Sequence, residues 1–308
     1  MFGRVSGLVM AGGRSYPRGM KFLIPLTCLW LSLTSTQAQK NYPPSFEGAV
    51  EQVYKTVGET ELKLWGFYPE DWKAADSRPA ILFFFGGGWT SGSPGQFEPH
   101  ARYLADRGMV AFLVDYRVSS RHGTLAKDCL EDARDAMRFV RTKAGELGVN
   151  PKRIAAGGGS AGGHLAACLG TIEADPESKP AALALFNPAC ILAPFAGKDP
   201  WPEDRSAELK ERMGAEPEAL SPIHHVTGAA PPCVIFHGTA DEMVPFETAA
   251  LFAVEMKRSG VKCILHEYEG EGHGFFNAGR TPAEGNEPAL PQTLTQLDGF
   301  LVELGWLE

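Results

Sequence analysis

Several signals are missing from this chain of 308 residues, and each absence excludes a class of protein. Neither a C-x-x-C nor an H-E-x-x-H motif occurs, so a zinc site has little support. The six cysteines form no close pairs and lie mostly in apolar runs, which is typical of small core residues rather than of a disulfide framework. The composition also lacks the bias of disordered or multi-span membrane proteins. We therefore expect a globular domain that needs no metal and no cofactor.

An excess of basic residues is also absent. The formal net charge is −8 at pH 7, and residues 1–38 hold four basic side chains and no acidic one. Without that segment, 25 basic residues of the original 29 face 37 acidic ones, which gives a net charge of −12. A surface this acidic repels nucleic acid and anionic lipid. No nucleic-acid partner is therefore expected, and neutral substrates fit better.

The N-terminal segment 1–38 has the order of a secretory signal peptide. Its basic stretch 1–21 is followed by an apolar run from Phe22 to about Leu33, and small residues follow at Thr36–Ala38. A basic region, a short apolar region and small residues at the cut are typical of an export signal. The apolar run is too short to span a bilayer comfortably. We predict a secreted or periplasmic protein with no stable membrane anchor, and the alternative is a buried N-terminal helix.

The rest of the chain, residues 39–308, alternates between strand and helix patterns. Predicted strands cover Gln52–Val57, Lys63–Tyr68, Pro79–Phe85, Met109–Tyr116, Arg153–Ala156, Ala182–Phe186, Cys233–His237 and Val261–Tyr268. Predicted helices cover Phe97–Arg107, Leu125–Leu147, a segment that opens near Ser160, Phe246–Ser259 and Leu290–Leu304. A strand pair followed by βα units predicts one α/β domain with a mostly parallel eight-stranded sheet and helices on both faces. Residues 193–230 contain five prolines and no strand, and we expect them to form a small lid.

Ser160 lies in the segment Gly158-Gly159-Ser160-Ala161-Gly162, which fits the motif G-x-S-x-G. A predicted strand precedes it and a predicted helix follows it. A nucleophile on such a tight strand-to-helix turn needs neighbours with almost no side chain. The turn also places the backbone N–H of Ala161 at a helix N-terminus, where it can stabilise an oxyanion.

Three further segments follow predicted strands. Gly86-Gly87-Gly88-Trp89 comes after the strand that ends at Phe85, and its glycines allow backbone N–H groups to approach a ligand oxygen. Asp241 lies just beyond the strand Cys233–His237, where a carboxylate can orient an imidazolium. His273 lies between glycines on a later loop, and histidine is the commonest general base. Because active sites of parallel sheets lie at the carboxyl ends of strands, these segments are expected to meet.

The chain order Ser160, Asp241, His273 is the order expected for α/β-hydrolases and differs from that of chymotrypsin-like and subtilisin-like enzymes. Each residue alone is a weak signal, and the joint order at strand ends carries the prediction. Glu242 competes with Asp241 for the acidic role. The remaining histidines of these regions are predicted to be structural or lid residues, namely His164, His224, His225 and His237.

These segments resemble α/β-hydrolases of the hormone-sensitive-lipase group and of the carbohydrate-esterase group that includes feruloyl and acetyl-xylan esterases. The resemblance runs from about Tyr54 to Trp306. It rests on GGGWTSGSP (86–94), DYR (115–117), GGSAGGHLA (158–166), HGTADEMVP (237–245) and GHGF (272–275). It implies a nucleophile Ser160, an acid Asp241, a base His273 and oxyanion donors Gly87, Gly88 and Ala161.

Two features depart from the pattern of these families. Phe85 stands where they usually have a histidine, so the loop loses that residue's hydrogen bonds and Phe85 must hold it by packing. Only about 46 residues separate Ala38 from Phe85, which leaves little room for the N-terminal helical cap of hormone-sensitive-lipase relatives. The site is therefore expected to be open, which favours bulky or polymeric substrates.

The sequence therefore predicts a secreted serine carboxylesterase that acts on short-acyl or hydroxycinnamoyl esters, with small molecules or polysaccharides as substrates. Trp89 beside the oxyanion loop offers a platform on which a sugar or aromatic ring could stack, or else it only packs the loop. The alternatives are a lipase for longer chains, a secreted peptidase and a non-catalytic carbohydrate-binding relative. A dinucleotide site is a further one, because Gly157, Gly159 and Gly162 fit G-x-G-x-x-G. The oligomeric state is not predicted.

Overall fold

A computed structural model describes residues 42–173, 175–197 and 199–308. The predicted signal peptide, residues 1–38, lies outside these residues. Pro44–Glu308 form one compact unit. Within the described residues, helices are all too short or too polar to cross a membrane.

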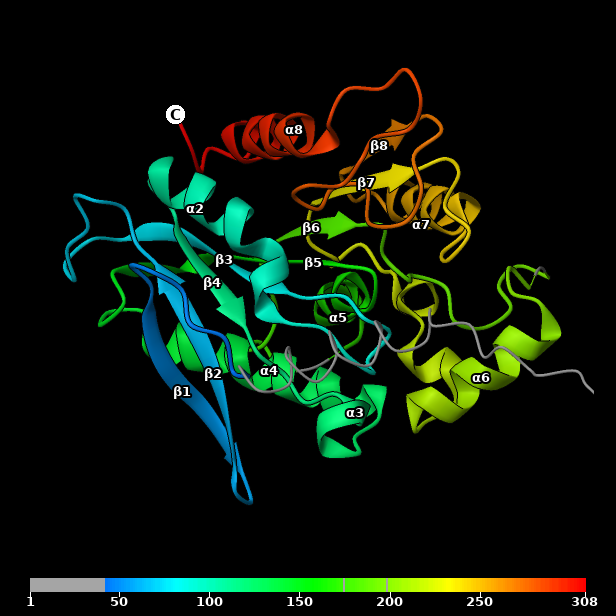
Figure 1. The fold of residues 1–308 in the computed structure, drawn as a ribbon, viewed down its shortest axis with the longest axis horizontal. Coiled ribbons are helices and arrows are strands. Elements are labelled where there is room, and N and C mark those ends of the chain that lie inside the picture. Colours follow the sequence, from blue (N-terminus) through cyan, green and yellow to red (C-terminus); the bar gives the residue numbers. More distant parts are fainter. Residues whose placement is uncertain (1–41, 174, 198) are drawn as a thin grey trace, which may run out of the picture. The chain divides into compact units, whose positions relative to one another are not determined.

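An eight-stranded sheet forms the centre of this unit (Figure 1). Its strands are β1 (Val50–Val57), β2 (Thr60–Phe67), β3 (Arg78–Phe84), β4 (Val110–Val114), β5 (Val149–Gly159), β6 (Ala182–Phe186), β7 (Cys233–Gly238) and β8 (Cys263–Tyr268). Their spatial order is β1-β2-β4-β3-β5-β6-β7-β8. β1 pairs antiparallel with β2, and β2 antiparallel with β4, whereas all later pairs are parallel. The predicted α/β-hydrolase sheet is confirmed.

Helices cover both faces of the sheet, because each face presents its own set of apolar side chains. The longer helices are α2 (Glu98–Asp106), α4 (Ala126–Thr142), α5 (Ala161–Thr171), α6 (Glu203–Met213), α7 (Phe246–Arg258) and α8 (Ala289–Glu303). Side chains of α4, α5 and α7 pack with Leu64, Leu82 and Phe112 on one face. Side chains of α2 and α8 pack with Trp65 and Phe83 on the other. α5 is buried along its whole length, which places its first residue under the carboxyl ends of the central strands.

Two predicted elements differ most from the structure, each for a local physical reason. β5 begins at Val149 and ends at Gly159, whereas the apolar pattern predicted only Arg153–Ala156. The residues before the predicted strand, Val149–Lys152, are mostly polar or exposed, and those after it, Gly157–Gly159, are glycines, so neither flank carries a clear apolar signal. α4 ends at Thr142 rather than at Leu147, because the chain forms turns before Gly148, whose φ of 63° is left-handed.

The predicted lid segment, residues 193–230, contains a helix that was not predicted. α6 (Glu203–Met213) is polar on most of its surface, and Leu209 and Met213 are its two buried apolar anchors. Figure 1 shows α6 beyond the ends toward which β6 and β7 point. Two short 3₁₀ helices, Pro217–Leu220 and Pro222–His225, then lead the chain back to the core.

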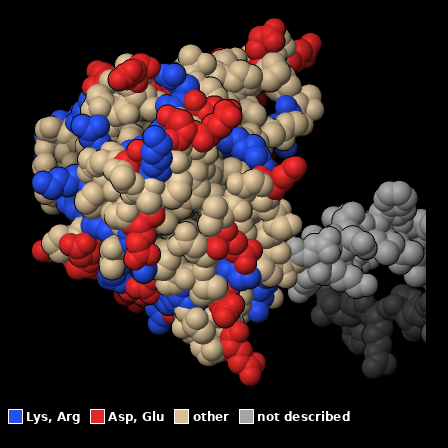
Figure 2. Space-filling model, turned by 90° about the vertical axis from the view of Figure 1, so that its left-hand side faces the viewer, with Lys and Arg blue, Asp and Glu red and all other residues tan. Residues whose placement is uncertain are grey.

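Cysteines and surface charges are distributed as their residue types suggest. Cys129, Cys168, Cys190, Cys233 and Cys263 are all buried and unpaired. Figure 2 shows acidic and basic side chains interspersed over the side of the molecule that carries β1 and β2. In the part of the chain that the structure describes, several such charges form ion pairs, among them Lys63 of β2 with Glu51 of β1 at 2.7 Å.

Candidate active site

Ser160 occupies a strained turn between β5 and α5. Its φ of 53° and ψ of −117° lie in a region that residues with a side chain rarely adopt. The turn is fixed from both sides: the Ser160 N–H donates to the Phe186 carbonyl at 2.9 Å, and the Ser160 carbonyl accepts from the His164 N–H at 2.8 Å. Strain of this kind that the surrounding structure sustains is typical of a functional residue.

The glycines around Ser160 are required by close backbone approach. A Cβ on Gly158 would lie 2.5 Å from the Phe84 carbonyl oxygen, and a Cβ on Gly162 would lie 2.0 Å from the same atom. The turn therefore packs directly against the end of β3, which carries the oxyanion loop. A Cβ on Gly157 or Gly159 would lie 2.9 or 2.6 Å from an aromatic ring, so close packing accounts for the G-x-G-x-x-G spacing without a dinucleotide.

His273 and Asp241 are brought together from separate loops. His273 Nδ1–H donates to Asp241 Oδ2 at 2.8 Å. The carboxylate is buried, and the imidazole is about a quarter exposed, with a side-chain exposure of 25%. This bond fixes the tautomer that leaves Nε2 free to accept a proton. The competing residue Glu242 is exposed to solvent.

The carboxylate of Asp241 is held in place by its own loop. Asp241 Oδ1 accepts from the N–H groups of Met243 and Val244, each at 2.9 Å. His237 lies fully buried with Nε2 at 3.4 Å from Asp241 Oδ2. Burial alone would raise the pKa of Asp241, but the hydrogen bonds from His237 and His273 outweigh it and hold the pKa below its ordinary value. Asp241 is therefore an anion that can stabilise a charged His273.

The loop after β3 presents backbone N–H groups to the same cavity. Gly87 has a φ of 126°, and a Cβ there would lie 2.3 Å from the Ser91 carbonyl oxygen, so only glycine fits. Among the residues that the structure describes, none accepts a hydrogen bond from the N–H of Gly87, Gly88 or Ala161. All three residues line the cavity that also contains Ser160. Unused donors that converge on one space are what an oxyanion hole requires.

Phe85 holds this loop by packing, as its sequence position implied. Its ring stacks on Tyr116 with centroids 4.1 Å apart, and it is fully buried. The Tyr116 hydroxyl donates to the Phe85 carbonyl at 2.6 Å. A stacked ring and one backbone bond thus replace the side-chain hydrogen bonds of a histidine.

Of the two interpretations of Trp89, its burial favours packing of the loop over a stacking platform. The indole is only 5% exposed, so no ring face is open to a sugar. Its Nε1–H donates to His164 Nδ1 at 3.2 Å, and the two rings meet edge to face. Trp89 therefore packs the loop, although a small part of it still borders the cavity.

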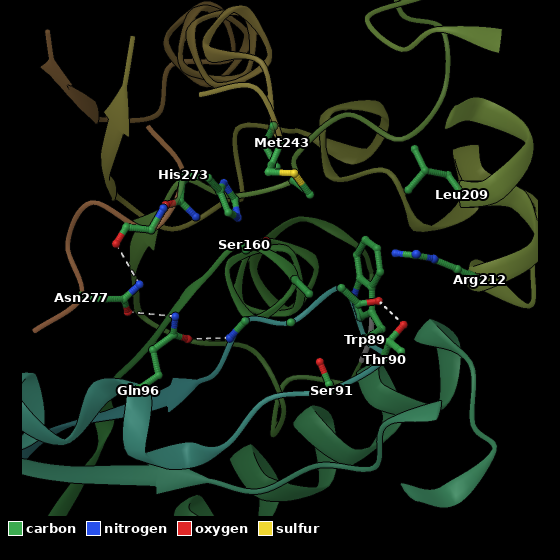
Figure 3. A pocket seen from close by; sticks show the side chains of 18 of the residues that line it. Trp89, Thr90, Ser91, Gln96, Ser160, Leu209, Arg212, Met243, His273 and Asn277 are labelled. Carbon is green, nitrogen blue, oxygen red and sulfur yellow. Dashed lines mark hydrogen bonds between the residues drawn. The ribbon is translucent and has the colours of Figure 1, made fainter. Parts of the chain in front are cut away.

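Sequence reasoning missed a chain of amide side chains that links the oxyanion loop to the histidine loop (Figure 3). The Gly86 N–H donates to Gln96 Oε1 at 2.6 Å. Gln96 Nε2 donates to Asn277 Oδ1 at 3.0 Å, and Asn277 Nδ2 donates to the Gly274 carbonyl at 2.8 Å. Gln96 and Asn277 are 181 positions apart, so no local pattern could have paired them.

The cavity over Ser160 has a volume of about 450 Å³. Figure 3 shows His273 on one side and Leu209 and Arg212 of α6 on the opposite side. Trp201 and Arg205, which also lie in the predicted lid segment, line the cavity too. Ser160 and His273 line this cavity together, but in the described part of the chain no hydrogen bond joins them. Such bonds are often long before substrate binds.

The match to known families decides the assignment. Residues 81–277 match the model of a family described as alpha/beta hydrolase fold. The chain belongs to this family. The matched residues include the oxyanion loop, the Ser160 turn, Asp241 and His273.

Curated relatives of this family are ester hydrolases. The chain is 28% identical to a probable carboxylic ester hydrolase, LipM, of Mycobacterium tuberculosis, over 71% of this chain and 54% of LipM. It is 32% identical to esterase LipC of the same organism, over 64% of this chain and 53% of LipC. The chain thus spans about half the length of these two relatives. Carboxylesterase NlhH of that organism is 25% identical, over 78% of this chain and 80% of NlhH.

Solved structures of a bacterial esterase are more similar. Thermogutta terrifontis esterase 2 phosphonylated by sarin is 51% identical, covers 86% of this chain and 98% of its own, and has a TM-score of 0.82. The same esterase with bound butyrate is 52% identical, with a TM-score of 0.80 and coverage of 86% and 98%.

Proposed function

We propose that this protein is a serine carboxylesterase in which Ser160 is the nucleophile, His273 the general base and Asp241 the residue that orients the base. One observation carries the proposal. A strained serine, a histidine bound to a buried carboxylate, and three unused backbone N–H groups all border one cavity. The relatives support it, since they are named as esterases and carboxylic ester hydrolases.

The proposed reaction has two steps. His273 Nε2 takes the proton of Ser160 as its oxygen attacks the ester carbonyl, and Asp241 stabilises the imidazolium that forms. The N–H groups of Gly87, Gly88 and Ala161 bind the oxyanion of the tetrahedral intermediate. The imidazolium then gives its proton to the leaving alcohol. A water molecule, activated by His273, hydrolyses the acyl-enzyme and releases the acid.

For the substrate, we propose short-chain esters. The cavity of about 450 Å³ holds a small acyl group, and residues 42–49 in front of β1 form no helical cap over it. The esterase of Thermogutta terrifontis binds butyrate and propionate. Trp89 gives no stacking platform. Only the open site and the proposed export therefore support hydroxycinnamoyl and polysaccharide esters as substrates.

A chain-length series of p-nitrophenyl esters, with acetylated xylan and methyl ferulate beside it, tests this proposal. We expect the highest kcat/KM at two to four carbons, taken as roughly the size that a pocket of this volume binds closely. A maximum at about twelve carbons or more, with no acetate or ferulate released, would indicate a lipase instead.

We also propose that the protein is exported. The order of basic, apolar and small residues in segment 1–38 supports this. N-terminal sequencing of the protein from a culture should find a mature chain that begins near Gln39. A full-length chain retained in the cytoplasm contradicts export and leaves the esterase proposal untouched.

A further inference from the structure

The cavity over Ser160 is lined by basic side chains, although the chain as a whole is acidic. Among the described residues, those that line it include two arginines, Arg205 and Arg212, and no aspartate or glutamate. The whole chain carries 37 acidic against 29 basic residues. Both arginines come from α6, and Figure 3 shows Arg212 on the side of the cavity opposite His273. A cleft lined by one sign of charge attracts ligands of the other sign.

Arg212 lies directly against the oxyanion loop. Its Nη1 is 3.1 Å from the point where a Cβ on Gly88 would stand. Its Nη2 forms an ion pair with Glu208, one helical turn earlier on α6. Nη1 and Nε have no hydrogen-bond acceptor among the described residues, so part of the guanidinium fork is available to a ligand. The side chain is partly exposed, at 37%, so a ligand can reach it.

Arg205, which precedes Arg212 by two helical turns on α6, is held in a fixed orientation. Its guanidinium lies over the Trp201 ring, 5.6 Å from the centroid, and Nη2 donates to the Met243 carbonyl at 3.4 Å. Trp201 is itself fixed, because its Nε1–H donates to the Ile191 carbonyl at 2.8 Å. The second positive charge of the cavity is therefore pre-positioned, which lowers the entropic cost of binding an anion.

The chemistry of the proposed reaction tells which part of a substrate faces these arginines. The leaving alcohol takes a proton from His273, so it lies on the histidine side. The oxyanion lies among the N–H groups of Gly87, Gly88 and Ala161. The acyl group then extends away from His273, toward Arg212. A guanidinium binds a carboxylate through two parallel hydrogen bonds.

We infer that the cavity recognises esters whose acyl part carries a carboxylate, such as half-esters of short dicarboxylic acids. This inference rests on the proposed esterase function and adds its substrate class. Arg212 is the main specificity residue, and Arg205 adds a second positive charge. Glu208 competes with the substrate carboxylate for Arg212.

Initial rates in a pH-stat test the inference, with monoethyl succinate as the anionic substrate and ethyl butyrate as the neutral one. The variant Arg212→Gln should lower the ratio of kcat/KM for monoethyl succinate to kcat/KM for ethyl butyrate by about tenfold or more, the usual effect of losing a charged hydrogen bond. Glu208→Gln should raise kcat/KM for monoethyl succinate alone. Arg258→Gln, on the exposed surface of α7, is the matched control and should change neither.

The outcomes separate the two proposals. If the wild-type protein does not hydrolyse ethyl butyrate, the esterase function itself fails. If it does, and Arg212→Gln lowers kcat/KM equally for both substrates, the inference is overturned. A third arm uses 4-acetoxybenzoate, which places the charge on the leaving group, and phenyl acetate as its neutral counterpart. An effect of Arg212→Gln on 4-acetoxybenzoate in place of monoethyl succinate overturns the acyl-side assignment.

Discussion

At the scale of single residues, the candidate site depends on short hydrogen bonds that hold backbone loops. Asp241 uses one oxygen for His273 and the other for two N–H groups of its own loop. Gln96 holds the oxyanion loop in a similar way, because its amide accepts from the Gly86 N–H and donates to Asn277. The side-chain amides of Gln96 and Asn277 hold other groups through these bonds and do not contact the reacting atoms. We therefore assign Gln96 and Asn277 as positioning residues.

Replacing Gln96 by leucine should lower kcat for p-nitrophenyl butyrate by about tenfold or more, because a misplaced oxyanion donor stabilises the transition state poorly. KM should change by about twofold at most, since substrate binding uses other contacts. Asn277→Leu should lower kcat to a similar extent. The double variant should have a kcat little below that of the less active single variant, because the two amides hold the loop together. Additive losses would show that the two amides act independently.

Residue chemistry also marks the limit of sequence reasoning here. Ser160, Asp241 and His273 could be predicted because each stands in a glycine-rich turn at the end of a predicted strand. Gln96, Asn277 and the arginines of α6 carry no local signal. Trp89 was open to two interpretations from sequence, and only its burial against His164 distinguishes them.

At the scale of elements, α5 connects the oxyanion loop to the lid segment through one buried side chain. His164 accepts from the Trp89 indole at Nδ1, and its Nε2–H donates to the Leu220 carbonyl at 2.7 Å. Burial lowers the pKa of His164 to about 4, so the ring is neutral near neutral pH and can do both. The loop that holds Gly87 and the segment after α6 are thus tied to the same helix.

The variant His164→Leu should lower the free energy of unfolding by about 2–4 kcal/mol, because it leaves the Trp89 N–H buried without a partner and the Leu220 carbonyl with only the Cys168 thiol, at 3.6 Å. His164→Gln should lose less, since an amide can both accept and donate. Urea unfolding measures the difference. Equal stability of the two variants would contradict the bridging role.

Element types were more predictable than element ends. Buried strands such as β6 carry continuous apolar runs, and the predicted Ala182–Phe186 matches the structure. The prediction made β5 too short, because the glycines at its end carry no strand signal. Close packing against β3 requires these glycines. α6 was missed because its sequence is mostly charged and only a few of its residues face the core.

At the scale of the whole molecule, one buried histidine should make the fold sensitive to acid. His100 is fully buried among aromatic rings, and both ring nitrogens lack a partner among the described residues. Burial lowers its pKa from 6.5 to about 3. The unfolded chain therefore binds a proton below pH 6.5 that the folded chain does not. The stability present above pH 6.5 is lost as the pH falls toward 3.

Urea unfolding at pH 7 and pH 4 tests this linkage. The wild-type protein should lose about 3 kcal/mol more between the two pH values than the variant His100→Phe, which has nothing to protonate at that position. His164 contributes in the same direction in both proteins, so it cancels in the comparison. Equal losses in the two proteins would mean that His100 is not a source of acid sensitivity.

The most direct test of the central claim is the turnover of p-nitrophenyl butyrate by Ser160→Ala, measured on protein whose far-UV circular dichroism and melting temperature match those of the wild type. Because a catalytic triad acts as a unit, kcat should fall by about 10⁴-fold or more. A folded Ser160→Ala protein that retains turnover within about tenfold of the wild type would contradict the assignment of Ser160 as the nucleophile.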